Sequence, residues 1–95
     1  MMMAIPGKLA SLLKAKVSSV TATVELAAGM VKVTTNYRKE ALDISVDYTL
    51  VKPEDNAALP YLIKKAINLA NEDIERQVTI EFNKLIDELH KATQN

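Results

Sequence analysis

The sequence predicts a small α+β domain in which a short N-terminal helix, a three-stranded antiparallel sheet and a long C-terminal helix follow one another. Two patterns support this fold class. Apolar and polar residues alternate in three segments between residues 18 and 50, which is typical of strands with one buried face. After residue 53 the apolar residues recur every three or four positions, as in an amphipathic helix. The 95 residues are expected to form one domain over 1–95.

The N-terminal helix is expected within residues 1–17, after a Pro-Gly break. Leu9, Leu12 and Leu13 recur at helical spacing, and lysines occupy other positions of the helical wheel. Near Val17 the hydrophobic period changes from about 3.6 to 2, where the first strand should begin.

The meander is expected over residues 18–50, with short turns at Ala27–Gly29 and Asn36–Lys39. Gly29 can adopt a positive φ, whereas the second turn is polar but has no glycine. Such a sheet has one apolar and one polar face, and the apolar face needs a cover. We expect this cover to be the C-terminal helix. The predicted apolar face consists of Val20, Ala22, Val24, Leu26, Val31, Val33, Thr35, Leu42, Ile44, Val46 and Tyr48.

The C-terminal helical segment is expected over residues 53–92. Pro53 and the two acids after it are typical of a helix start, and Asn56 is a candidate cap. Pro60 is tolerated only in a first turn, so the long helix should begin between Asn56 and Pro60. Its apolar stripe then continues for about ten turns, giving roughly 33–36 residues and about 50 Å.

The length of this helix predicts a homodimer. A strand of six or seven residues measures only about 20 Å, so the sheet covers at most half of the helix. The rest of the stripe must meet the short first helix or a second chain, and the first helix offers little area. We therefore expect a dimer interface formed by Val78, Phe82, Leu85 and Leu89.

Two segments carry a resemblance to a known family. "GMVKVTTNYRKEALDISVD" and the later "LPYLIKKAINLA" resemble the YbaB/EbfC family of bacterial nucleoid-associated DNA-binding proteins. The resemblance implies an α-β-β-β-α subunit, a tweezer-like homodimer, double-stranded DNA as partner, and a location in the cytoplasm at the nucleoid. The chain departs from the family pattern at Tyr37, where a turn glycine is usual, and at Tyr48, where a proline is usual. Its first helix is also shorter.

The charge distribution indicates where DNA would bind. Residues 1–39 carry six basic residues and one acid, whereas residues 40–95 carry six basic residues and eleven acids. Basic helix surfaces would contact phosphates without reading bases. The pI near 6.6 is below that of strong nucleic-acid binders, which predicts weak, salt-sensitive binding with little sequence selectivity. The predicted DNA-binding residues are Lys8, Lys14, Lys16, Arg38, Lys39, Arg76 and Lys84.

Nothing in the sequence suggests catalysis. There is no cysteine, His90 has no partner ligand at metal-binding spacing, and the serines at 18 and 19 have no base nearby. The acids Glu72, Asp73 and Glu75 point in different directions on a helix and are expected to be solvated. We expect no enzyme activity, cofactor, metal or small-molecule substrate. We also expect no signal peptide and no membrane span.

A second function remains open at this point. The exposed part of the apolar stripe suits a dimeric scaffold or adaptor that binds another protein. DNA binding would weaken steeply with salt, whereas apolar protein binding would be nearly indifferent to it. Asn68 lies beside the stripe, and we expect its amide to bond to backbone at a strand end or to its counterpart across the dimer, in preference to a DNA contact.

Overall fold

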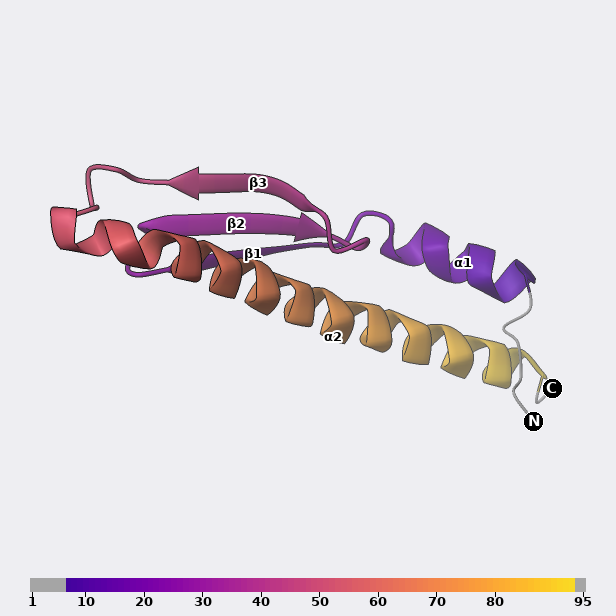
Figure 1. The fold of residues 1–95 in the computed structure, drawn as a ribbon. Coiled ribbons are helices and arrows are strands. Elements are labelled where there is room, and N and C mark those ends of the chain that lie inside the picture. Colours follow the sequence, from indigo (N-terminus) through magenta and orange to yellow (C-terminus); the bar gives the residue numbers. More distant parts are fainter. Residues whose placement is uncertain (1–6, 94–95) are drawn as a thin grey trace, which may run out of the picture.

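The computed structural model describes residues 7–93 and the side chains of residues 10–91. Two helices flank a three-stranded sheet along the chain, and a short 3₁₀-helix follows the sheet (Figure 1). This order confirms the predicted α-β-β-β-α fold. The elements are α1 (Gly7–Val17), β1 (Thr21–Leu26), β2 (Val31–Asn36), β3 (Ala41–Val46), η1 (Pro53–Ala58) and α2 (Leu59–Thr93).

The sheet is an antiparallel meander in the order β1-β2-β3. β1 and β2 pair without interruption, from Thr21 opposite Asn36 to Leu26 opposite Val31. The pairing of β2 with β3 shifts between Thr34 and Thr35, which leaves Leu42 as an extra residue in β3. Such a bulge bends the edge strand and increases its twist.

The turn between β1 and β2 uses left-handed backbone at three successive residues. Gly29 has φ +91°, as its predicted role requires, but Ala27 (φ 54°) and Ala28 (φ 57°) adopt the same region. Left-handed backbone costs an alanine about 1–2 kcal/mol, so the sequence pattern alone did not indicate this conformation. The Met30 N–H closes the turn by donating to the Ala27 carbonyl at 3.1 Å.

The turn between β2 and β3 forms without glycine because the Asn36 side chain organises it. The Asn36 Oδ1 atom accepts hydrogen bonds from the backbone N–H groups of Arg38 and Glu40, both at 3.0 Å. Lys39 adopts φ 63°, and its N–H donates to the Asn36 carbonyl at 2.9 Å. An asparagine that bonds to the backbone two residues further on is a common substitute for a glycine turn.

The core lies between α2 and the first two strands. Val31 and Val33 of β2 are completely buried, as are Ala66 and Ala70 of α2, and Ile74 is nearly so. The two alanines bring the helix close to the sheet, and the larger residues around them fill the gap. The alternation of Val31, Val33 and Thr35 toward the helix confirms the predicted inner face of this strand.

The expectation that α2 would cover the whole apolar face is wrong for β3. Leu42 is 58% exposed, Ile44 46% and Tyr48 72%. A helix is about 10 Å wide and neighbouring strands lie about 4.8 Å apart, so one helix covers two strands. The helix lies over β1 and β2, and the inner side of β3 stays open to solvent.

The first helix covers more of α2 than the sequence suggested. α1 runs beside the C-terminal half of α2 (Figure 1), where Val17 and Leu85 are buried, Leu85 with only 3% exposure. Val78 packs against the Ala22–Ala70–Ile74 cluster of the same chain. Two of the four predicted interface residues are therefore already covered within one chain. Phe82 is half-buried and Leu89 is 39% exposed.

The segment predicted as helix from residue 53 begins with a separate 3₁₀-helix. Its N-cap is Lys52 and not Asn56, and the Lys52 N–H donates to the Asp55 carboxylate at 3.0 Å. The Leu59 N–H donates to the Asn56 carbonyl, which is the 3₁₀ pattern. Pro60 has no N–H for an i→i−4 bond, so α-helical bonding starts only at Leu59, within the predicted limits.

Candidate nucleic-acid interface

Four of the predicted basic residues with described side chains, Lys16, Lys39, Arg76 and Lys84, pair with carboxylates of α2. Their carboxylate partners on this helix lie between Asp73 and Glu88, a distance of about 22 Å at 1.5 Å per residue. One strand of B-DNA carries about six phosphates over such a length. We call this group the central basic band. It comprises Lys14 and Lys16 of α1, Arg38 and Lys39 of the β2–β3 turn, and Arg76 and Lys84 of α2.

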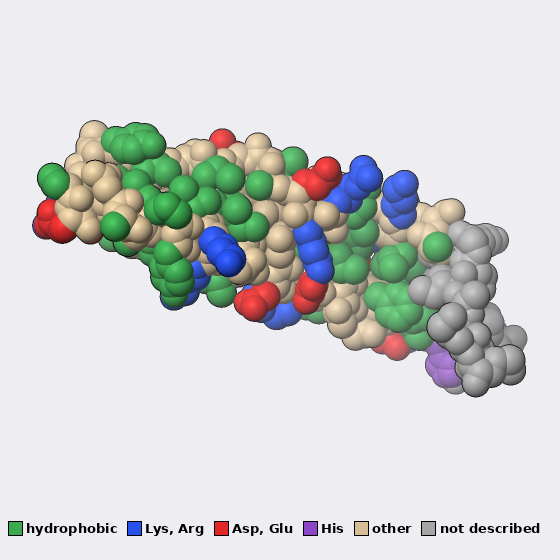
Figure 2. All heavy atoms as spheres, viewed as in Figure 1, with side chains coloured by type: hydrophobic (Ala, Val, Ile, Leu, Met, Phe, Trp, Pro, Cys, Tyr) green, Lys and Arg blue, Asp and Glu red, His purple; other side chains and the backbone are tan. Residues whose placement is uncertain are grey.

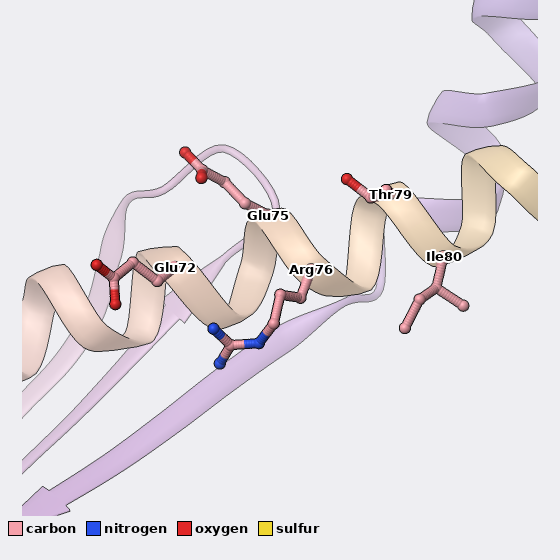
Figure 3. A pocket seen from close by; sticks show the side chains of 5 residues that line it. All are labelled: Glu72, Glu75, Arg76, Thr79 and Ile80. Atoms are coloured by element: carbon pink, nitrogen blue, oxygen red, sulfur yellow. The ribbon is translucent and has the colours of Figure 1, made fainter.

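The central basic band does not form one continuous face. Glu75 and Arg76 point away from each other (Figure 3), as neighbouring positions of a helix do. Lys39 reaches α2 at Glu75, from the side of the β2–β3 turn, whereas Arg76 bonds to Asp73. The structure therefore brings these cations to one part of the molecule but presents them on different sides of α2.

Most cations of the band are paired with carboxylates in the described part of the chain. Exposed ion pairs contribute little to stability, so a phosphate can replace the carboxylate at small cost. The pairing does reduce the positive field that would attract DNA from a distance. The pairs are Lys16–Glu88 (3.9 Å), Arg38–Glu40 (3.9 Å), Arg76–Asp73 (3.2 Å), Lys84–Glu81 (3.6 Å) and Lys39–Glu75.

The pair between Lys39 and Glu75 ties the β2–β3 turn to α2. The Lys39 ammonium donates a hydrogen bond to the Glu75 carboxylate, and this bond and the attraction between the charges lower the pKa of Glu75 below its ordinary value. The contact joins residues 36 positions apart in the chain, so it contributes to holding the edge of the sheet against the helix.

The lysines of α1 differ from one another. Lys14 is exposed, with no carboxylate of the described side chains within ion-pair distance, whereas Lys16 pairs with Glu88. Both lie in the last turn of the helix, where positive charge also stabilises the helix terminus. The side chain of Lys8 lies outside the described residues.

A second basic group, which was not among the predicted sites, lies on the first half of α2. Lys64 and Lys65 line a shallow groove of about 350 Å³ together with Tyr61, Asn68, Leu69 and Glu72. The Lys65 ammonium lies 6.0 Å from the centre of the Tyr61 ring. Asn68 is exposed in this groove, and its side chain makes no hydrogen bond to another described residue of the same chain. A run without acids from residue 56 to 71 is the sequence signal that could have identified this group.

A hollow on α2, among the described residues, does not suggest a reaction site. The hollow, of about 590 Å³, is lined by five side chains that all come from α2, and they spread over the helix surface instead of converging (Figure 3). No group of three potential metal ligands occurs among the described residues. The hollow is an open helix surface, which suits contact with a macromolecule better than enclosure of a small one.

The protein also has an exposed apolar surface over β3. In Figure 2 hydrophobic side chains gather over β3, beside α2. The exposed large hydrophobic residues of β3 are Leu42 and Ile44, and the exposed Tyr48 and Leu50 follow them in the chain. Exposed apolar residues that adjoin in this way are typical of a surface that meets another protein. None of the helices between residues 7 and 93 combines the length and apolar character needed to cross a membrane.

The fold and surface define a small α+β protein built around a meander and one long helix, with charged and apolar surfaces suited to macromolecular partners. The chain belongs to the YbaB/EbfC DNA-binding family, whose model matches residues 5–89. It is also similar to a nucleoid-associated protein of Moorella thermoacetica (strain ATCC 39073 / JCM 9320), with 43% identity over 65 residues. That match covers 66% of this chain and 62% of the relative.

Proposed function

We propose that this protein binds duplex DNA as a homodimer and is associated with the nucleoid in the cytoplasm. The observation that carries the proposal is membership of a DNA-binding family over residues 5–89, combined with cations whose carboxylate partners on α2, from Asp73 to Glu88, span about 22 Å. Lysine and arginine tips at this spacing suit phosphates along a DNA strand. Phosphate contacts carry no base information, so the proposed binding depends little on sequence.

The homodimer in this proposal uses the apolar surfaces that the single chain leaves open. On α2 these are Phe82, which is half-buried, and Leu89; on the sheet they are Leu42 and Ile44 of β3. A symmetric dimer presents the same surface from both chains, so each contact across the interface occurs twice. We propose that β3 contributes to the interface because its apolar side has no cover within the chain.

One observation favours a second function. The exposed side of β3 would also accept a different protein, which would make the chain an adaptor. Salt separates the two functions, because apolar contacts persist when ionic contacts to phosphate are screened.

The experiment that tests the DNA function compares the parent with a variant of α1. Lys8, Lys14 and Lys16 are replaced together by Gln, which removes up to three cations per chain and six per dimer. Binding of a labelled duplex is followed by fluorescence polarisation over a series of salt concentrations. Each phosphate contact contributes about 0.9 to the slope of log affinity against log salt, so the slope should become shallower by up to about 5.

The helical content of this variant should remain unchanged in far-ultraviolet circular dichroism, because Lys14 and Lys16 are exposed. A variant that binds with the affinity and slope of the parent would exclude α1 from the DNA surface. A parent that fails to bind any duplex at about 50 mM salt would contradict the DNA function itself and favour the adaptor.

A further inference from the structure

The first half of α2 carries two adjacent lysines without ion pairs among the described residues, whereas in the central basic band only Lys14 is unpaired in that part of the chain. Between Asn56 and Asn71 the chain contains two lysines and no acid. No described carboxylate lies within 4.0 Å of Lys64 or Lys65, whereas most of the band is paired. A phosphate approaching these two lysines displaces no existing ion pair. Their charge is therefore more available than that of the paired residues of the central basic band.

The helix holds these lysines in a fixed position. Ala66, directly after Lys65, is completely buried against the sheet, and Ala70 one turn later is buried as well. The backbone that carries the lysines is therefore anchored on the core, and only their side chains must be ordered on binding. A site on a rigid helix positions its ligands better than one on a loop.

Two neighbouring side chains, those of Tyr61 and Asn68, add further contacts to the two lysines. Tyr61, which is 63% exposed, lies four residues before Lys65, and the Lys65 ammonium sits over its ring. This contact restricts the Lys65 side chain. Asn68, one turn further, adds an exposed amide that can donate to a phosphate oxygen. These side chains line one groove, and Glu72 limits the site at the other end.

We propose that Tyr61, Lys64, Lys65 and Asn68 form a second phosphate-contact site for duplex DNA, separate from the central basic band. The proposal rests on the proposed DNA-binding function and extends the path of the duplex along α2 toward its N-terminus. Lys64 and Lys65 each contact a backbone phosphate, Asn68 donates to a neighbouring oxygen, and Tyr61 positions Lys65. The site carries no base specificity, since every contact is to the backbone.

The test compares the parent with Lys64→Gln/Lys65→Gln in duplex polarisation titrations over a salt series. The double variant should bind more weakly. Its slope of log affinity against log salt should be shallower by about 1.8 for each chain that contacts the duplex, which is about 0.9 for each lost contact. Lys64→Arg/Lys65→Arg retains both charges and should keep the parental slope. Lys32→Gln/Lys91→Gln loses the same charge elsewhere and should change the slope by less than the first variant does.

The outcomes separate this inference from the function on which it rests. If the parent binds duplex DNA and Lys64→Gln/Lys65→Gln matches its affinity and slope, the second site is wrong and the DNA function stands. An equal loss in Lys32→Gln/Lys91→Gln would also overturn the site, because net charge alone would explain the effect. If the parent does not bind duplex DNA at any salt concentration, both the function and the site are wrong.

Discussion

Individual residues determine the conformation of the turns of the sheet and the contact that joins the sheet to α2. The Asn36 side chain replaces the missing glycine in the second turn by accepting two backbone hydrogen bonds at 3.0 Å. That turn places Lys39 against Glu75 of α2. Neither contact is visible in a hydrophobic pattern, because each depends on where a polar side chain points after folding.

Replacing Glu75 by Gln should reduce stability in a pH-dependent way. The pKa of Glu75 is lowered in the folded protein by the hydrogen bond and charge of Lys39. Its contribution is therefore fully present above the pKa of the unfolded chain and is lost as the pH falls through the lower folded pKa. Chemical denaturation at about pH 7 should show the parent as slightly more stable than Glu75→Gln, and the difference should shrink at acidic pH, as the pH falls below the ordinary pKa of a glutamate, about 4.3.

Glu72→Gln is the matched control, since Glu72 forms no ion pair among the described residues. Its stability relative to the parent should not follow the same pH dependence. A Glu75→Gln variant whose deficit is the same at both pH values would show that the Lys39 contact does not act through charge.

The elements of the fold differ in how well their sequence pattern specifies them. The alternation in β2 and the stripe in α2 correctly predict which side chains are buried, because each is packed along most of its length. β3 has the same alternation as β2, yet its apolar side is exposed. Alternation reports which side of a strand is apolar but not whether a helix is wide enough to cover it. The packing of α1 against α2 could not be predicted from the sequence, because no local pattern shows where one helix lies relative to the other.

Because α1 packs on α2, Leu85 is buried within the single chain and should contribute to its stability. Leu85→Ala should lower the free energy of unfolding by about 2–5 kcal/mol, because it empties a buried position. Leu89→Ala, at a position that is 39% exposed, should cost about 1 kcal/mol or less. Urea denaturation of both variants at one protein concentration provides the comparison. A cost for Leu85→Ala below about 0.5 kcal/mol would mean that α1 does not cover this part of α2 in solution.

The exposed side of β3 is where a change should affect assembly more than folding. Ile44→Thr keeps a β-branched residue in the strand and removes apolar area from a position that is 46% exposed. It should raise the dimer dissociation constant about tenfold or more in sedimentation equilibrium, because a symmetric interface loses the contact twice. Ile80→Thr, at a position on α2 that is 53% exposed, is the control and should leave dimerisation unchanged. A parent that sediments as a monomer of 10.5 kDa would contradict the proposed dimer.

At the scale of the whole molecule, the elongated shape determines how the charges are distributed. The formal net charge is zero, and the extent of 64 Å along the longest axis spreads the cations over a long body. The uneven charge along the sequence drew attention to the first 39 residues, yet folding places acids of α2 beside those cations. The predicted set does not include Lys64 and Lys65, which lie in the acidic part of the sequence but within its run without acids from Asn56 to Asn71. Only the structure shows that no described carboxylate pairs with them.

The central claim is that this protein holds duplex DNA by its phosphates, and the salt dependence of binding tests it most directly. Two labelled duplexes of equal length and unrelated sequence should be titrated with the parent protein over about 50–200 mM salt. The account predicts similar affinities for both duplexes and equal, steep slopes of log affinity against log salt, of about 0.9 for each phosphate contacted. Binding that does not change with salt, or strong binding to one duplex alone, would contradict it.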